Sequence, residues 1–298
     1  MKNLLLSLTI ISALFTACKK ETGDEATPAM DNSDKQAVTI GQVPATFTKK
    51  AFIENFTSAA NGKCPETDAL VANMITNNPG RVIAASIHTG DVMETSFMQT
   101  VKGHFNNGVA PGAGCYMISR VPVGNKVFIS NQQMQAATNK SFNLAAKCGL
   151  AINSNIIGRK AYVQVHAGFN QTLTGTHNLT VYLVEDNISK PGKGYDQINN
   201  YNNTPSSAYF NLGNPIVGYT HNHVLRLVVT NGLGNAINPN KMIAGGIELQ
   251  TFVFDLPGTI NLSNASIIAF VNKPGATPTT HEVLNVQICK LGSMKPWD

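Results

Sequence analysis

Cys64 is the residue whose type and setting point most directly to covalent chemistry. It follows Lys63 and precedes Pro65, a residue favoured in the first turn of a helix. A thiol beside a cation at a helix N-terminus is expected to have a lowered pKa. Dithiol exchange needs a C-x-x-C pair, however, and the window Asn61-Gly62-Lys63-Cys64 begins with Asn61. We therefore interpret Cys64 as structural, with a thiol-active protein that uses Cys64 as the alternative.

His221 and His223 are the candidate metal ligands. They lie two residues apart at the start of a predicted strand, so both side chains point to one face. Zinc and copper need a third and usually a fourth ligand, which the spacing does not supply. Leu225 and Leu227 continue the same face, which favours the rim of a core over a metal site. We expect no metal and no cofactor.

The fingerprints of serine hydrolases, zinc proteases, P-loop proteins and dinucleotide-binding enzymes are not found, so we expect no enzyme.

A long connection between Ile188 and Tyr219 is the candidate ligand loop. It is rich in Asn, Gly, Ser and Pro, and a connection of this length inside a domain is usually a binding loop or a solvated insertion. Its aromatic side chains could stack on a sugar or a peptide. These aromatic residues are Tyr195, Tyr201, Tyr209 and Phe210.

A strand, a helix and a second strand must position Cys64. Residues 51–56 are predicted to form the first strand. The helix begins at Pro65, carries Leu70, Val71, Met74 and Ile75 at helical spacing, and ends at Asn77-Asn78-Pro79-Gly80. The apolar run 82–87 predicts a buried strand, so the three elements form a right-handed βαβ unit with parallel strands. Residues 94–105 and 130–138 are further predicted helices, and 115–121 a further predicted strand.

This unit resembles a thioredoxin-type domain. The resemblance rests on Ile53-Glu54-Asn55-Phe56-Thr57, on Cys64-Pro65 at a helix start, and on Arg81-Val82-Ile83 leading to Ile87-His88. In that family the first cysteine of C-x-x-C is the nucleophile. Here Asn61 stands at that position, and Cys64 stands at the resolving position. The resemblance implies a thioredoxin-like domain over residues 46–140 that has lost dithiol exchange.

Residues 141–298 are rich in predicted strands. Val163, Val165 and Ala167 share one strand face, and Gln164 and His166 lie on the other. Seven short strands separated by turn residues predict an antiparallel β-sandwich. The predicted fold class is therefore a two-domain α+β protein, with a thioredoxin-like α/β domain followed by the sandwich. The predicted strands are 144–152, 161–169, 179–185, 223–230, 243–254, 267–271 and 283–289.

The first residues carry a targeting signal. Lys2 and the apolar run from Leu4 to Phe15 are typical of a secretory signal peptide over residues 1–17, and the run is too short to span a bilayer. Cys18 follows small residues as in a bacterial lipobox, where the cysteine thiol receives a diacylglycerol. The alternative is ordinary signal cleavage beside an incidental cysteine. Residues 18–45 have almost no large apolar side chain and predict a flexible tether.

Composition limits the classes of partner. Hydrophobic residues make up 43% of the 298 residues, which is enough for real cores, and charged residues make up only 13%. The low charge argues against coiled coils and long solvated helices. The formal net charge of +5 is spread thinly without a dense Lys/Arg cluster, so nucleic acid is not an expected partner.

The second half resembles the Omp28-like outer-membrane lipoprotein family of Bacteroidetes. The resemblance rests on the segment Val181–Asp186, on Tyr219 and on the segment His221–Arg226, and it covers residues 46–298. The layout agrees as well, with a lipid anchor, a thioredoxin-like segment and a β-rich half. The resemblance implies an outer-membrane protein, periplasmic or surface-exposed, with a suspected adhesin or receptor role. It assigns no catalytic or binding residue.

The four cysteines after Cys18 are expected to pair. Four thiols in an oxidising compartment allow three pairings. The thioredoxin-like resemblance places the loop before Cys115 against the helix that begins at Cys64, which implies a Cys64–Cys115 bridge. Cys148 and Cys289 lie on the first and last strands of the β-rich half, so a Cys148–Cys289 bridge is predicted there.

The expected function is a non-catalytic, lipid-anchored binding or adhesion protein of the outer membrane. Its partners would be the membrane, through the lipid on Cys18, and a protein or glycan ligand. A thiol-active envelope protein and a structural partner of an envelope complex are the alternatives.

Overall fold

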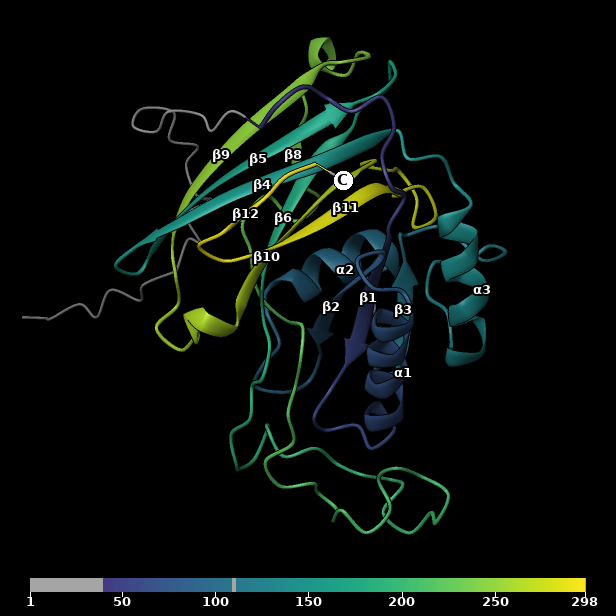
Figure 1. The fold of residues 1–298 in the computed structure, drawn as a ribbon. Coiled ribbons are helices and arrows are strands. Elements are labelled where there is room, and N and C mark those ends of the chain that lie inside the picture. The colour runs from purple at the N-terminus through teal and green to yellow at the C-terminus, as the bar shows by residue number, and fades with distance from the viewer. Residues whose placement is uncertain (1–39, 109–110, 298) are drawn as a thin grey trace, which may run out of the picture.

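The computed structural model describes residues 40–108 and 111–297, so the expected signal peptide, Cys18 and most of the expected tether lie outside the described residues. The fold is mixed α+β with two sheets (Figure 1). The eight-stranded sheet has the order β11-β10-β6-β7-β2-β1-β3, with β8 also beside β6, and the four-stranded sheet has the order β12-β4-β5-β9. The helices are α1 (Cys64–Asn77), α2 (Phe97–Phe105) and α3 (Asn131–Phe142), with short 3-10 turns at Pro239–Lys241 and Leu262–Asn264. The strands are β1 (Ala51–Thr57), β2 (Val82–His88), β3 (Cys115–Ile118), β4 (Cys148–Ile157), β5 (Lys160–Phe169), β6 (Asn178–Glu185), β7 (Val224–Val228), β8 (Asn235–Ala236), β9 (Ile247–Asp255), β10 (Ala265–Asn272), β11 (Val283–Lys290) and β12 (Met294–Lys295).

The predicted strand–helix–strand unit is confirmed. Strands β1 and β2 are parallel and paired along their whole length, and α1 connects them. Pro65 lies in the first turn of α1, where its missing N–H costs no intrahelical hydrogen bond. Strand β3 is antiparallel to β1 on its other side. Helix α3 is capped by Ser130, whose backbone N–H is bonded by the Gln133 side chain in a capping box.

Alternation along the strands divides the larger sheet into two faces. Phe52 and Phe56 of β1 pack with α2 and with Tyr182 and Phe270 in one apolar cluster. The opposite face of β1 and β2 carries smaller side chains that pack under α1 and α3; this second cluster includes Ala51, Ile53, Val82, Ala84, Val71 and Met134. The ends of β1 and β2 are thus held between helices on both faces.

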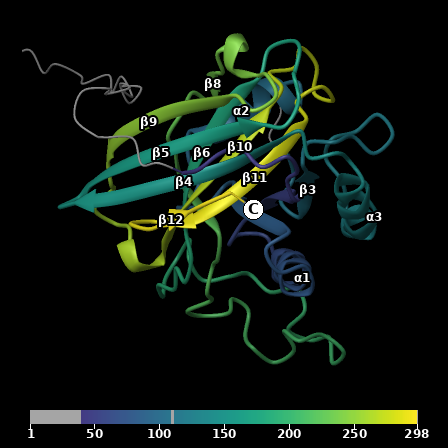
Figure 2. The same ribbon diagram turned by 45° about the horizontal axis from the view of Figure 1, so that its top comes forward.

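The four-stranded sheet packs on the other end of the larger sheet (Figure 2). Strands β4, β5 and β9 contribute Leu150, Val163 and Phe252 to this interface, and β6 and β10 contribute Val181 and Ile267. Gly149 lies against the Phe47 ring, where an added Cβ would come within 2.2 Å of a ring carbon. The predicted strands of the second half therefore exist, and they belong to two facing sheets.

The expected domain boundary near residue 140 does not separate two sheets. Strand β2 from the first half pairs in parallel with β7 from the second half at Ser86 and Val224. The Val283 N–H donates to the Ser119 carbonyl oxygen at 2.8 Å, so β11 is also tied to the end of β3. The edge of β2 that faces away from β1 has backbone groups that need partners, and the Ser86 N–H donates to the carbonyl oxygen of His223, just before β7, at 2.7 Å.

A buried ion pair joins the two halves on the α2 side of the larger sheet. The Arg120 guanidinium donates to both carboxylate oxygens of Glu54, at 2.7 and 2.8 Å, and to the Tyr182 hydroxyl at 3.1 Å. Arg120 and Glu54 are both 0% exposed. Bidentate geometry of this kind is what makes burial of two opposite charges tolerable.

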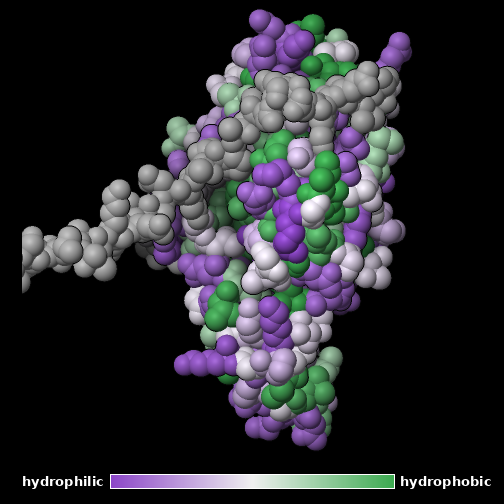
Figure 3. All heavy atoms as spheres, turned by 90° about the vertical axis from the view of Figure 1, so that its left-hand side faces the viewer, coloured by the Kyte–Doolittle hydropathy of each residue, from purple (hydrophilic) through white to green (hydrophobic). Residues whose placement is uncertain are grey.

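Within residues 40–108 and 111–297, no helix is both long and apolar enough to cross a membrane. Figure 3 shows apolar residues interspersed with polar ones on one side of the molecule, with an apolar group at its lower end. Exposed apolar side chains of the connection between β6 and β7 include Phe210, Leu212 and Val217.

Candidate functional site

The floor of the candidate site is formed by the last residues of β1 and β2 on the face below α1. Asn55 is paired in register with Ser86, and Thr57 with His88. The preceding residues on the same face, Ala51, Ile53, Val82 and Ala84, are apolar and buried. Each strand therefore changes from apolar to polar at its carboxyl end. In open α/β sheets the carboxyl ends of parallel strands are where ligand sites form.

Asp68 of α1 forms one wall above this floor. The Asn55 Nδ2 donates to Asp68 Oδ1 at 2.8 Å, and the Thr57 hydroxyl also interacts with this carboxyl group. Asp68 is partly exposed, because it faces the cavity, yet protein surrounds it closely. This burial raises the pKa of Asp68 above its usual value, and the hydrogen bonds from Asn55 only partly oppose the effect.

His88 is held from behind by Asp91. Its Nδ1 lies 2.7 Å from Asp91 Oδ2, and the ring is almost fully buried. Asp91 also accepts hydrogen bonds from the backbone N–H groups of Ala59 and Met93, each at 2.8 Å. Burial alone would raise the pKa of Asp91, but the hydrogen bond and charge of His88 and these backbone donors outweigh burial and lower it. The other ring nitrogen, Nε2, is buried without a hydrogen-bond partner.

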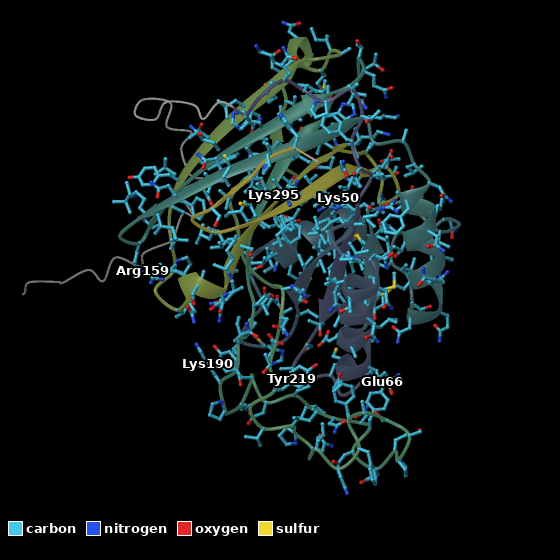
Figure 4. The ribbon with its side chains drawn as sticks, in the orientation of Figure 1. Lys50, Glu66, Arg159, Lys190, Tyr219 and Lys295 are labelled. Carbon is cyan, nitrogen blue, oxygen red and sulfur yellow. The ribbon has the colours of Figure 1, made fainter. Side chains whose placement is uncertain are left out.

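The connection between β6 and β7 forms the opposite wall. In Figure 4, Tyr219 lies at the end of the molecule where this connection passes below α1, near Glu66 of the first helical turn. The His221 Nε2 lies 2.8 Å from the Tyr195 carbonyl oxygen, and the His221 ring meets His88 edge-on with ring centroids 5.3 Å apart. Burial lowers the pKa of His221 to about 4, so His221 is neutral near pH 7.

Together these residues enclose a cavity of about 310 Å³. This is at the small end of the range for small-molecule pockets. Its wall includes no Lys or Arg side chain. The lining residues are Asn55, Thr57, Asp68, Ala69, Val71, Ala72, Asn73, Ser86, His88, Tyr209, Tyr219, Thr220, His221, Asn222 and His223.

The two candidate metal ligands both line this cavity, and each is occupied by another partner. His223 has a positive φ of 58°, its N–H donates to Asp186 Oδ1 at 2.7 Å, and its Nδ1 lies 3.0 Å from the same oxygen. Strand β7 begins only at Val224, so the predicted strand pairing of His221 and His223 on one face does not occur. Within the described ranges, no group of three or more His, Cys, Asp or Glu residues could hold a metal ion.

One of the four predicted ligand-loop aromatics reaches the cavity, namely Tyr209. Tyr195 supplies its carbonyl oxygen to His221, and its ring lies 5.3 Å from the Lys190 ammonium. The Tyr201 hydroxyl interacts with Glu66. Phe210 is 39% exposed and lies outside the cavity wall.

The same connection covers the Asn61-Gly62-Lys63-Cys64 window. The buried Gln197 amide donates to the carbonyl oxygens of Ser58 and Asn61 at 3.2 and 3.0 Å, and the Asn200 N–H donates to the Gly62 carbonyl at 3.0 Å. A Cβ at Gly62 would lie only 2.8 Å from the Asn200 backbone nitrogen, so glycine permits this close approach. Cys64 is consequently 0% exposed.

Burial also overturns the expected thiol chemistry of Cys64. It raises the pKa of the Cys64 thiol to about 11, with a further contribution from the Asp68 charge. The expected lowering by Lys63 and the helix N-terminus does not occur, because the Lys63 side chain is exposed to solvent while the thiol is enclosed.

Neither predicted disulfide is present: Cys64, Cys115, Cys148 and Cys289 are all free thiols. The thiols of Cys64 and Cys115 are close enough to interact electrostatically, but Cys115 Sγ donates to the Gly112 carbonyl oxygen at 3.0 Å.

Cys148 and Cys289 of the second predicted bridge lie at different positions along strands of two different sheets. The Cys148 carbonyl accepts from the Asn285 amide at 2.9 Å. Cys289 Sγ instead lies 3.3 Å from the Ser293 carbonyl oxygen, which also accepts from the Ser154 hydroxyl. Cys148 is the first residue of β4, whereas Cys289 lies beside the far half of that strand.

Asn55 and His88 belong to the segments that carry the thioredoxin-like resemblance, but no site role was predicted there for them or for Asp68 and Asp91. The signal that could have found the two strand residues is the polar ending of two otherwise apolar strands in a predicted βαβ unit. Asp91 and Asp68 carry no such signal, because their proximity to these strand ends depends on how the chain folds after each strand.

Comparisons with known proteins give one family match and two similar folds. The family model for outer membrane protein Omp28 matches residues 112–295. Among solved structures, HBP35 of Porphyromonas gingivalis is similar with a TM-score of 0.64 at 18% identity, covering 84% of this chain and 78% of that chain. Protein AGR_C_4864 from Agrobacterium tumefaciens is similar with a TM-score of 0.50 at 11% identity, covering 85% of this chain and 98% of that chain. At these identities the two structures show similarity of fold alone. None of the curated proteins matches. Because the family match covers more than half of the chain, the chain belongs to the outer membrane protein Omp28 family.

Proposed function

We propose that this protein is a non-catalytic, lipid-anchored binding protein of the outer membrane, and that its ligand occupies the cavity between α1 and the connection from β6 to β7. Membership of the Omp28 family supports the outer-membrane association. The observation that carries the binding role is the cavity itself, in which the buried His88 Nε2 has no hydrogen-bond partner.

An unpartnered polar atom in a small cavity favours ligand binding over simple packing. Leaving a buried acceptor unsatisfied costs about 1–3 kcal/mol. A structural core could avoid this cost with an apolar side chain, whereas a binding site keeps the polar atom for its ligand. The structural-partner alternative gives no reason for such a cavity.

The thiol-active alternative is disfavoured. Cys64 is fully covered, its pKa is raised to about 11, and Asn61 stands where a nucleophilic cysteine would be needed. Thiol reactivity requires an accessible thiolate, and neither condition is met.

Blocking the cavity tests the binding site. The full-length chain is applied to glycan and peptide arrays, beside Ala72→Trp, which places an indole at the cavity wall, and Thr76→Trp, a matched change one helical turn further along α1. Binding that is lost in Ala72→Trp and retained in Thr76→Trp supports the proposal. Equal binding by both variants would place the ligand elsewhere.

Replacing Cys18 tests the anchor. If Cys18 is acylated, Cys18→Ser leaves the membrane fraction or remains unprocessed, and the mass of the mature protein falls by the mass of the lipid. Unchanged fractionation and mass would rule out the lipid anchor.

A further inference from the structure

The polar groups that line the cavity favour one chemical class of ligand. Resting on the proposed binding function, we infer that the cavity takes a small hydroxylated amine, such as an amino sugar or an amino alcohol. Its ammonium group lies against Asp68, and one of its hydroxyl groups reaches His88 Nε2. Asp68 has no Lys or Arg partner in the cavity wall, His88 Nε2 has no hydrogen-bond partner, and further polar groups line the wall.

Asp68 is an enclosed carboxyl group without a Lys or Arg partner. Its hydrogen-bond partner Asn55 is neutral. No Lys or Arg lines the cavity, and the two histidines that interact electrostatically with Asp68, His88 and His223, are each held by another carboxylate, Asp91 and Asp186. Enclosing a carboxylate is unfavourable unless an opposite charge accompanies it. An ammonium ligand would supply that charge together with N–H donors.

The raised pKa of Asp68 agrees with this geometry. Burial is its main cause, and the hydrogen bond from Asn55 and the electrostatic effect of His88 only partly oppose it. A bound ammonium would favour the ionised carboxylate and reverse this effect.

His88 offers a second point of attachment. Asp91 Oδ2 lies 2.7 Å from Nδ1, so Nε2 is the ring nitrogen that remains for a ligand. That atom is buried and has no partner, and the ring is 2% exposed. Asn55 Oδ1 is likewise buried without a partner. An amide oxygen only accepts hydrogen bonds, so a ligand group that reaches Asn55 Oδ1 must donate one.

The rest of the wall favours hydroxyl groups on the ligand over a bare alkyl chain. Tyr209 and Tyr219 bring phenolic hydroxyls that bond to each other, and Ser86 and Asn73 add further polar groups. A cavity of about 310 Å³ suits a molecule of a few to about a dozen heavy atoms rather than a polymer. An anionic ligand would be repelled by Asp68, and the wall has no Lys or Arg to bind the anion.

Three sugars that differ in the group on carbon 2 test whether the cavity prefers an ammonium group. Binding of glucosamine, N-acetylglucosamine and glucose to the full-length chain is measured by titration calorimetry, at a pH where the amine of glucosamine is protonated. We expect glucosamine to bind about tenfold or more tightly than the other two, the effect of one hydrogen bond to a charged group. Asp68→Asn keeps the size and the hydrogen bond from Asn55 and is expected to abolish this preference.

Matched variants control for folding. Asp255→Asn makes the same change in an exposed carboxylate on β9 and is expected to retain the preference for glucosamine. Thermal unfolding of Asp68→Asn checks that the fold is kept.

Two results would overturn the inference. The first is no binding of glucosamine. The second is equal binding of glucose and glucosamine, whether or not Asp68 is changed. Equal binding of glucose and glucosamine that is lost in Ala72→Trp would still place the binding site in the cavity. That result would contradict the preference for an amine and leave the proposed binding function intact.

Discussion

Asp68 shows how a single enclosed carboxyl group affects stability as well as binding. Burial raises its native pKa above the ordinary value of 3.8, so the native state holds the proton more tightly than the unfolded chain does. The stability contributed by the protonated form is fully present below the unfolded pKa. It is lost as pH rises through the native pKa. At neutral pH the ligand-free protein therefore carries a destabilising group, as sites kept for function often do.

We predict that Asp68→Asn raises the unfolding midpoint of the ligand-free chain near pH 7. Asn cannot ionise and can still accept the hydrogen bond from Asn55, so the cost of the enclosed charge disappears. Melting curves of both proteins between about pH 4 and pH 7 provide the measurement. The advantage of the variant should grow with pH, and a variant that is less stable at neutral pH would contradict this account.

At Cys64 the relevant quantity is the rate of alkylation. Because the thiol is covered and its pKa is about 11, we predict that iodoacetamide modifies native Cys64 far more slowly than the unfolded chain at the same pH. Mass spectrometry of the labelled peptide gives the rate.

Gly62→Ala should accelerate labelling of Cys64, because a Cβ there collides with Asn200 and displaces the covering connection. Gly103→Ala, where an added Cβ meets nothing, should leave the rate unchanged. Rapid labelling of native Cys64, or insulin-disulfide reduction that Cys64→Ser abolishes, would restore the thiol-active interpretation.

At the scale of elements, the buried Glu54–Arg120 pair ties β1 to the segment after β3 and to Tyr182 of β6. The three side chains lie on the α2 side of the sheet, among Phe52, Phe105 and Phe270. The Arg120 guanidinium also lies over the rings of Phe105 and Phe270, at 4.9 and 5.1 Å from their centroids. The pair therefore fixes the relative position of strands that are far apart in sequence.

We predict that Glu54→Gln lowers the free energy of unfolding by about 3–5 kcal/mol, because it leaves the Arg120 charge buried without its counter-ion. Chemical denaturation measures the change. Asp255→Asn removes one partner of the exposed Lys160–Asp255 pair and should leave the unfolding midpoint unchanged, since exposed pairs contribute little. Equal effects of the two substitutions would show that the buried pair does not hold the strands together.

The connection between β6 and β7 acts as an element in its own right, although it contains no long strand. Isolated bridges pair Ile188 with His221 and Gln197 with Ile216, which gives it a defined course. It fills one wall of the cavity and covers the start of α1. A substitution that loosens this connection is therefore expected to affect both the cavity and Cys64.

At the scale of the whole molecule, the continuous eight-stranded sheet makes a prediction about cooperativity. Strands from both halves of the chain share that sheet through β2 and β7 and are further joined by the buried hydrogen bond from Arg120 to Tyr182. We predict one thermal transition by calorimetry, with equal calorimetric and van't Hoff enthalpies. Two separate transitions would instead support the two-domain organisation expected from the sequence, with its boundary near residue 140.

Local patterning determined much of the secondary structure. Apolar runs and alternation located β1, β2, β5, β6, β10 and β11 to within a few residues, and Pro65, Ser130 and the Asn-Asn-Pro-Gly stretch marked helix ends. These signals are local because side-chain periodicity and capping act over a few residues. The family resemblance was also carried by short segments, and the match to the Omp28 family confirms it.

The tertiary structure decided which of these elements meet. No local signal shows that the edge of β2 pairs with β7, because strand pairing depends on backbone groups far apart in the chain. For the same reason the structure contains free thiols in place of the predicted disulfides, since Cys148 and Cys289 lie at different positions along strands of two different sheets. The cavity, too, arises only when the connection between β6 and β7 folds back over α1, and the resulting burial decides the chemistry of Cys64 and Asp68. Spacing in the sequence could propose a thiolate, but desolvation, which is a property of the folded environment, raised its pKa.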